Sequence, residues 1–136
     1  MDKSKNWIEF WKKYGQDSKG NSEQEQVLRT INKSPISNEL WEFTLGKLAE
    51  QIEPNIDDSL LELCCGNGLI SRYFSSTCKK ITSVDISENL ITMIDSKKYP
   101  NINTQISDIR DIVFPDHHFT KIIIYAGIQY LTLAEA

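Results

Sequence analysis

Short apolar runs alternate with segments of helical periodicity from residue 57 onward, and this alternation limits the possible folds more than any other feature. Strands are expected at SLLELC (59–64), KKITSVD (79–85), INTQIS (102–107) and FTKIIIYAG (119–127). Helices are expected at GLISRYFSS (68–76) and between Ser87 and Pro100. Strands that alternate with helices predict an α/β fold: a Rossmann-like, doubly wound, mostly parallel sheet over residues 56–136.

Residues 1–55 lack this alternation and are predicted to form an N-terminal helical cap segment. A first helix is expected over residues 5–14, where aromatic side chains recur at helical spacing (Trp7, Phe10, Trp11, Tyr14). Ser22 and Glu25 have the spacing of a capping box. Ser37 is a suitable N-cap for a helix that ends near Pro54. We expect the aromatic stripe to pack mainly in the core.

The charge of the chain bears on its partners. The 136 residues carry a formal net charge of −4, and the basic residues are scattered along the sequence. Binding to phosphate backbones needs a basic surface, so we expect neither a nucleic acid nor a membrane as a partner. No apolar run approaches the length of a membrane span. Three cysteines, two of them adjacent, favour reduced thiols in the cytoplasm over a disulfide framework.

The cysteines and histidines do not predict a metal site. Zinc ligands are spaced C-x2-C or wider so that both sulfurs reach one ion, whereas Cys64 and Cys65 are neighbours. His117 and His118 follow Pro115 in an expected loop, where exposed histidines are the simpler interpretation. We therefore expect the cysteines to pack as small apolar residues.

The stretch GNGLIS follows the first strand and opens a helix, which is where α/β folds bind cofactors. Gly66 and Gly68 allow positive φ and a close approach of the backbone to a ligand. Asp85 ends the second strand, where an acidic residue can accept hydrogen bonds from a ribose. Glu62 lies in an apolar strand, where an unpaired charge is costly, so a cationic ligand group is a natural partner.

Two cofactors fit parts of this pattern. GNGLIS differs from the dinucleotide pattern G-x-G-x-x-G only by Ser71 at the last position, which favours NAD. NAD folds, however, need an apolar residue at the buried position of Glu62. A ligand with an ammonium group, such as the methionine part of S-adenosylmethionine, explains Glu62 better.

Four segments in order, LLELCCGNG, VDIS, SDIRD and FTKIIIYAGIQYL, resemble the class I S-adenosylmethionine-dependent methyltransferases. The resemblance covers residues 56–136 and implies the strand order 3-2-1-4. It implies S-adenosyl-L-methionine as cofactor and methyl transfer as the reaction. In similar enzymes the N-terminal helices form a lid over the cofactor, and Tyr14 would then touch the cofactor carboxylate.

The resemblance also implies how the glycine loop would work. Glu62 would hold the ammonium group of the methionine part. Gly66 and Gly68 would let the loop pass close to the sulfonium and the carboxylate, with Asn67 between them. Cys64 replaces the first glycine of the family's loop, where a small residue is all that the turn requires.

The remaining implied contacts come from the next two strand ends. Asp85 would accept hydrogen bonds from both ribose hydroxyls, and Ile86 would pack on the adenine. Asp108 would accept a hydrogen bond from the adenine amino group. The backbone N–H of Ile109 would reach a ring nitrogen.

At the end of the fourth strand, Tyr125 and Ala126 would border the transferring methyl group. The sequence N/D-P-P-Y, typical of amino-group methylation in nucleic acids, is absent there. Together with the acidic composition, this favours a small-molecule methyl acceptor. No residue is a convincing catalytic base, although Gln129 and Tyr130 could face the acceptor.

The family's sheet has seven strands, and this sequence shows four. Thr132 and Glu135 have the spacing of a helix start, after which the sequence stops. We therefore expect an incomplete domain whose fourth strand, 121–126, forms an exposed edge with a tendency to self-associate. Two alternatives stay open: a fragment of an NAD-dependent oxidoreductase, and a non-catalytic protein that retains the fold.

Overall fold

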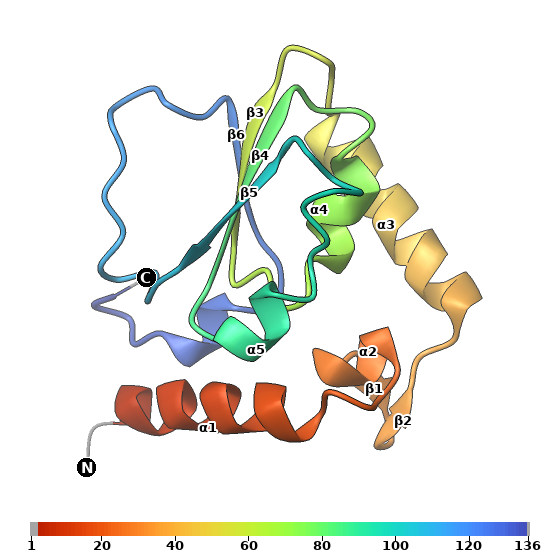
Figure 1. Ribbon diagram of the computed structural model, residues 1–136, viewed down its shortest axis with the longest axis vertical. Coiled ribbons are helices and arrows are strands. Elements are labelled where there is room, and N and C mark those ends of the chain that lie inside the picture. Colours follow the sequence, from red (N-terminus) through yellow and green to blue (C-terminus); the bar gives the residue numbers. More distant parts are fainter. Residues whose placement is uncertain (1–2, 136) are drawn as a thin grey trace.

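The computed structural model describes residues 3–135, and a parallel four-stranded sheet lies at its centre (Figure 1). The strands are β3 (Ser59–Leu63), β4 (Lys80–Asp85), β5 (Ile102–Ile106) and β6 (Lys121–Ile124). Their order in the sheet is β5-β4-β3-β6, and every pair is parallel. In chain order this is 3-2-1-4, so the predicted fold class and strand order are confirmed.

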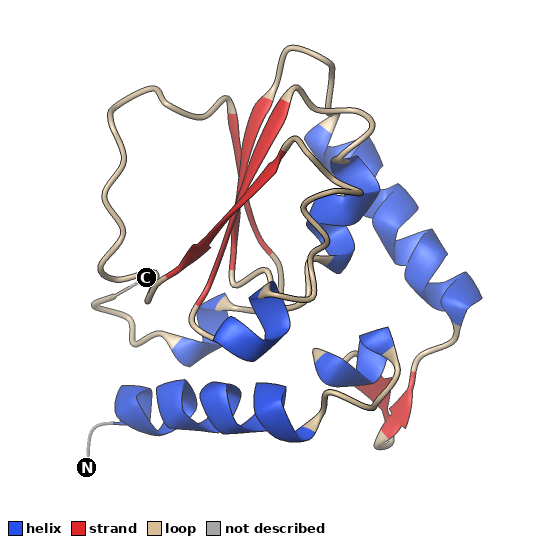
Figure 2. Ribbon diagram, viewed as in Figure 1, coloured by secondary structure: helices blue, strands red, loops and turns tan. Residues whose placement is uncertain are grey.

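The helices lie unevenly around this sheet. Three cover the sheet or its ends: α3 (Asn38–Ile52), α4 (Leu69–Phe74) and α5 (Glu88–Ile91). Figure 2 shows α3 and α4 together on one side of the strands, while the connection from β5 to β6 runs along the other side as a loop. At the carboxyl ends of the strands, α1 (Lys3–Asp17) crosses beneath the sheet near α5 and the short 3-10 helix η1 (Ile128–Tyr130).

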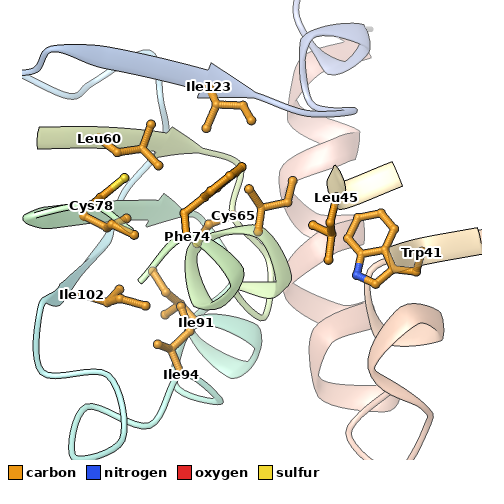
Figure 3. Packing of buried hydrophobic residues seen from close by; sticks show 12 residues of the cluster. Trp41, Leu45, Leu60, Cys65, Phe74, Cys78, Ile91, Ile94, Ile102 and Ile123 are labelled. Carbon is orange, nitrogen blue, oxygen red and sulfur yellow. The ribbon is translucent and has the colours of Figure 1, made fainter. Parts of the chain in front are cut away.

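The core lies between the sheet and the helices on its covered side (Figure 3). Leu60 and Ile81 on the two central strands are fully buried, and Phe74 from α4 packs with them. Trp41 and Leu45 bring α3 onto the same cluster. Full burial of such side chains stabilises the fold by about 1.5–3 kcal/mol each.

Capping explains where several helices begin. The hydroxyl of Ser37 accepts a hydrogen bond from Leu40 N at 3.2 Å, as predicted for the start of α3. Ser22 accepts one from Glu25 N at 3.3 Å and opens α2 (Glu23–Gln26). At the other end of the chain, Thr132 N donates to the Glu135 carboxylate at 2.9 Å. The expected capping contact therefore forms, and any helix beyond it lies outside the described residues.

Two elements differ from the prediction. A small antiparallel hairpin of β1 (Thr30–Ile31) and β2 (Ser34–Pro35) stands where a loop was expected. Its turn residues, Asn32 and Lys33, have φ of 51° and 66°, and without a glycine they leave little trace in the sequence. The predicted helix before Pro100 ends early, at Ile91. The carboxylate of Asp95 accepts a hydrogen bond from Lys97 N and forms a turn instead.

The fourth strand lies at the edge of the sheet, as expected, although β6 ends at Ile124 rather than Ala126. Ile122 is 65% exposed on this edge. Self-association through it stays a prediction. Within residues 3–135, no helix combines the length and the apolar character that a membrane crossing would need.

Candidate functional site

A cavity lies at the carboxyl ends of β3, β4, β5 and β6, where α1 crosses the sheet. Its wall includes the predicted cofactor residues with two exceptions, Gly68 and Tyr125. The residues brought together are Glu62, Cys64, Gly66, Asn67, Asp85, Ile86, Asp108, Ile109 and Ala126. Side chains from separate strand ends thus meet in one place, as the parallel topology requires.

Glu62 is the most deeply buried acidic residue of the wall, with 2% of its surface exposed. Ser71 donates two hydrogen bonds to its Oε2, one from the backbone N at 3.0 Å and one from the hydroxyl. The Ser71 hydroxyl also lies 2.5 Å from the hydroxyl of Ser83. Burial raises the pKa of Glu62 to about 7, against the lowering effect of the Ser71 donors. Ser71, which breaks the dinucleotide pattern, therefore serves to hold this carboxyl group.

The glycine loop needs its glycines for packing as well as for backbone conformation. Gly66 and Gly68 have φ of 56° and 77°. A Cβ at Gly66 would lie 2.5 Å from Val27 Cγ1, and one at Gly68 would lie 2.5 Å from Ile94 Cδ1. Gly68 thus faces Ile94, which follows α5 in the chain, rather than the cavity.

The cysteines of the loop are free thiols in protected positions. Cys65 is buried in the core, and Cys64 lines the cavity. Desolvation raises the pKa of Cys64 to about 12, so its thiol stays protonated and weakly nucleophilic. Among residues 3–135 no group of three His, Cys, Asp or Glu side chains is placed to hold a metal ion.

Asp85 fixes the loop against the next helix. Its Oδ2 accepts a hydrogen bond from Gly66 N, and its Oδ1 accepts one from Ser87 N, both at 2.8 Å. Ser87 occupies the N-cap position of α5, but its hydroxyl makes no capping bond. The carboxylate of Asp85 holds the backbone N–H of Ser87 itself and so fixes the start of α5. Burial raises the pKa of Asp85, while the backbone donors act in the opposite direction. Each carboxylate oxygen keeps a further lone pair for a ligand.

Asp108 is held by a neighbour that the sequence analysis did not single out. Arg110 Nε donates to both of its oxygens at 2.9 and 3.1 Å, and Nη2 donates to Oδ2 at 2.5 Å. This guanidinium lowers the pKa of Asp108, which stays ionised. Arg110 also pairs with Glu135 at 2.8 Å and so ties the end of the described chain to the cavity wall.

Asn67 joins the glycine loop to the N-terminal segment. Its Nδ2 donates to the backbone oxygen of Glu23 and to Oε1 of Gln26, both at 2.9 Å. Asn67 is 2% exposed, and its Oδ1 is buried without a hydrogen-bond partner. The loop and α2 are therefore clasped together.

Aromatic residues close the cavity on the side of α1. The ring centroids of Trp7 and Trp11 lie 4.8 and 5.7 Å from that of Tyr130 on η1. All three side chains line the cavity, so two residues of the stripe that we expected mainly in the core, Trp7 and Trp11, instead cover the site. Tyr14 is turned away from it, because its hydroxyl donates to Glu25 O at 2.7 Å.

The other residues expected near the acceptor are placed differently. Tyr125 packs its ring against Trp41 and beneath the guanidinium of Arg29. Gln129 donates to Ala126 O at 2.7 Å and is exposed. Tyr130 is the one of the three that lines the cavity. Arg29, also in the wall, was missed because a lone arginine between two short elements carries no recognisable pattern.

Comparison with known proteins identifies similar chains. This chain is 32% identical over 88 residues to the ribosomal RNA small subunit methyltransferase A of Mesomycoplasma hyopneumoniae, an alignment of 62% of this chain and 33% of that protein. The chain thus spans about a third of the length of that curated relative. The 23S rRNA methyltransferase ErmE is 27% identical with a TM-score of 0.54, over 64% of this chain and 37% of the other.

A third similar structure matches more of the chain. It is phosphoethanolamine N-methyltransferase 1 of Haemonchus contortus, in complex with phosphoethanolamine and S-adenosylhomocysteine. The TM-score is 0.78 at 13% identity, over 94% of this chain and 27% of the other. At this identity the match shows a shared fold.

These relatives correct one expectation. The exclusion of nucleic acid as a partner was wrong, because curated relatives and solved structures similar to this chain are rRNA methyltransferases. The exclusion relied on the net charge of a chain that spans a third of such a relative. Recognition of nucleic acid depends on local basic surfaces, which an overall charge does not describe.

The family model for the methyltransferase domain matches residues 60–136, which is more than half of the chain. The matched range contains the glycine loop and the strand ends that form the cavity. The chain therefore belongs to the methyltransferase domain family, among the class I S-adenosylmethionine-dependent methyltransferases that its motifs resemble.

Proposed function

We propose that the chain binds S-adenosylmethionine in this cavity, and that the protein transfers its methyl group to a small-molecule acceptor held under α1. The observation that carries the proposal is the meeting of three acidic residues from three adjacent strand ends in one cavity beside a glycine loop: Glu62, Asp85 and Asp108. Family membership supports the same cofactor.

Each residue of the cavity then has a role that its surroundings allow. Glu62 receives the ammonium group on the oxygen that Ser71 does not occupy. Asp85 receives the ribose hydroxyls while it holds Gly66 N. Asp108, kept ionised by Arg110, accepts the adenine amino group.

The rest of the wall supplies shape and backbone groups. Ile86 packs on the adenine, and the N–H of Ile109 reaches a ring nitrogen. Cys64 and Ala126 border the sulfonium and the methyl group. Both have positive φ, at 56° and 55°, which lets the backbone turn closely around a ligand.

The reaction needs little chemistry from the protein. The acceptor nucleophile attacks the methyl carbon in line with the sulfonium, the carbon–sulfur bond breaks, and its electron pair stays on sulfur. Holding the two reactants in line is the main source of acceleration. Trp7, Trp11 and Tyr130 would exclude water from the reacting atoms by covering the cavity.

A small acceptor is favoured by this cover. The structural match that extends over α1, at 94% of the chain, is to an enzyme crystallised with phosphoethanolamine. The match to the rRNA methyltransferase ErmE covers 64% of the chain. The fold that includes α1 is thus shared with an enzyme crystallised with a small molecule, and this supports a small acceptor.

Calorimetry tests the cofactor directly. Wild-type protein is titrated with S-adenosylmethionine, S-adenosylhomocysteine and NAD, and we expect binding of the first two only. Binding of NAD alone would support the oxidoreductase alternative, and binding of none would support a non-catalytic protein.

The acceptor is tested by following S-adenosylhomocysteine formation with a panel of small amines, phosphorylated amines and carboxylates, and in parallel with ribosomal RNA. Turnover with a member of the panel is the expected result. Turnover with ribosomal RNA, together with no turnover with any small acceptor, would contradict the small-molecule proposal. It would leave the cofactor proposal intact.

A further inference from the structure

Asp108 lies in the cavity wall, and its carboxylate is fully occupied by one neighbour, Arg110. Oδ1 accepts hydrogen bonds from Arg110 N at 3.0 Å and from Nε at 2.9 Å. Oδ2 accepts from the same Nε at 3.1 Å and from Nη2 at 2.5 Å. A carboxylate offers about four lone-pair positions, two on each oxygen, so these contacts fill them.

Asp85 differs from Asp108 in this respect. Each of its oxygens accepts one of these hydrogen bonds, from Gly66 N and from Ser87 N, and so keeps a position for a ribose hydroxyl. Asp108 keeps no such position for the adenine amino group that the proposed function assigns to it. The amino group can be accepted there only if Arg110 gives up at least one of its contacts.

A second carboxylate already contacts the same guanidinium. Arg110 Nη1, the nitrogen that does not contact Asp108, donates to Glu135 Oε1 at 2.8 Å. Glu135 Oε2 accepts a hydrogen bond from Thr132 N at 2.9 Å, which fixes this side chain. The guanidinium therefore bridges two carboxylates, and it keeps a charged partner if it releases Asp108.

The partial exposure of these groups makes such an exchange feasible. The side chains of Asp108, Arg110 and Glu135 are 15, 26 and 25% exposed, so water screens their attraction. A ligand donor can therefore replace an N–H of Arg110. Hydrogen bonding to Arg110 lowers the pKa of Asp108 most, and the charge of Lys12 lowers it further. The carboxylate thus stays ionised when the guanidinium leaves.

We propose that Arg110 competes with the adenine ring for Asp108, so that cofactor binding moves the guanidinium from Asp108 onto Glu135. The inference rests on the proposed function, in which Asp108 accepts the adenine amino group. Arg110 then sets the affinity for adenine ligands from within the cavity wall. Glu135 follows Tyr130 and Leu131, which line the cavity, so the exchange also connects the adenine side to this part of the wall.

The test compares S-adenosylhomocysteine with its purine analogue, which has hydrogen in place of the adenine amino group. Only S-adenosylhomocysteine needs an oxygen of Asp108. Calorimetry should show that Arg110→Met binds S-adenosylhomocysteine about twofold to fivefold more tightly than wild type, because the loss of a partly exposed ion pair ends the competition. The affinity for the purine analogue should stay within about 1.5-fold.

Glu135→Gln tests the second position of the guanidinium. The glutamine keeps an oxygen for Thr132 N but offers no charge, so Arg110 should stay on Asp108 and S-adenosylhomocysteine should bind about twofold more weakly. In the Arg110→Met background the same substitution should have no effect, because the guanidinium is gone. Arg110→Lys, with an ammonium in place of the planar fork, should bind with an affinity between those of wild type and Arg110→Met.

Nitrogen-15 NMR of the arginine side chains follows the exchange in the wild type. The Nε–H signal of Arg110, assigned by its loss in Arg110→Lys, should move when S-adenosylhomocysteine is added. With the purine analogue it should stay close to its position in the free protein. If Arg110→Met loses its fold by circular dichroism, this signal and the affinities of Glu135→Gln decide.

Weaker or unchanged binding of S-adenosylhomocysteine by a folded Arg110→Met variant would overturn the competition and show that Arg110 supports Asp108 instead. An Nε–H signal at the same position in both complexes would also overturn it. Wild-type protein that binds neither S-adenosylhomocysteine nor its purine analogue would overturn the proposed function itself, so the two failures are distinguishable.

Discussion

At the scale of single residues, the loop shows how a side chain can occupy a position suited to glycine. Cys64 has φ of 56°, in the left-handed region that L-residues adopt at a cost of about 1–2 kcal/mol. Gly127 stands opposite this side chain: a Cβ there would lie 2.7 Å from Cys64 Cβ. The small residue at position 127 therefore leaves room for the thiol at position 64.

Cys64→Gly should leave binding of S-adenosylhomocysteine within about threefold of wild type, since glycine fits the same backbone. Relief of the left-handed strain and the greater freedom of glycine in the unfolded chain oppose each other, so the unfolding free energy should change by less than about 1 kcal/mol. Calorimetry and urea denaturation measure the two quantities.

Cys64→Val is the matched comparison, because a β-branched residue fits left-handed backbone poorly and would crowd Gly127. It should weaken binding and stability together. Similar behaviour of the glycine and valine variants would show that position 64 does not shape the site.

Asp85→Ala should weaken binding of S-adenosylhomocysteine by about 1.5–3 kcal/mol, because ribose hydroxyls would lose a charged acceptor. It should also lower the melting temperature, since Gly66 N and Ser87 N lose their acceptor. Asp85→Asn keeps an oxygen for one of the two N–H groups and should recover part of the stability but less of the affinity. An unchanged dissociation constant in a folded Asp85→Ala variant would remove this residue from the site.

At the scale of elements, prediction succeeded where the signal was local. The strands have β-branched or alternating residues, and the caps at Ser22 and Ser37 follow short-range rules, so their positions were readable. The hairpin of β1 and β2 turns through residues other than glycine and was missed. Arg29 was missed for a different reason, since its contact at Tyr125 O lies 96 residues away in the sequence.

The first helix has a consequence for ligand entry. The cavity beneath α1 encloses about 100 Å³, whereas sites for ligands of this size usually measure about 300–1,000 Å³. A cofactor of this size needs a wider space, which an outward movement of α1 would provide. The contacts of α1 with the rest of the molecule include Gly15, where a Cβ would lie 2.3 Å from Ser87 Oγ, so the far end of the helix is closely packed on α5.

We expect amide hydrogen exchange in α1 to slow when S-adenosylhomocysteine binds, because a ligand between α1 and the sheet would join them. Exchange in β3 and β4, which are protected in the core, should change little. Trp11→Ala, which removes part of the cover, should reduce the slowing in α1. Equal exchange in α1 with and without ligand would show that the helix takes no part in binding.

At the scale of the whole molecule, the predicted strand order 3-2-1-4 brings the acidic strand ends to one edge of the sheet. The motifs predicted this arrangement because each acidic residue has a fixed place relative to its strand. The motifs did not predict the partners of these acidic residues. The pairing of Arg110 with Asp108 and the burial of Glu62 beside Ser71 depend on how the side chains pack. That burial couples protonation in the site to the stability of the entire fold.

The protonation of Glu62 determines whether the stability of the fold rises or falls with pH. Its pKa rises from 4.5 to about 7 on folding, so the folded state binds more protons than the unfolded state between these values. Stability from this group is fully present below pH 4.5 and is lost as the pH rises through about 7, by about 3 kcal/mol in total. Asp108 and Glu135, whose pKa values are lowered, act in the opposite direction and only in more acidic solution.

Urea denaturation from pH 5 to pH 8 should therefore show a fall in the unfolding free energy of the ligand-free protein. Glu62→Gln keeps an oxygen for the Ser71 donors and cannot ionise, so its unfolding free energy should vary much less over the same range. Asp85→Asn is the control, because burial also raises the pKa of Asp85 and the contribution of this group acts in the same direction as that of Glu62. A wild-type slope that persists undiminished in Glu62→Gln would place the titrating group elsewhere in the molecule.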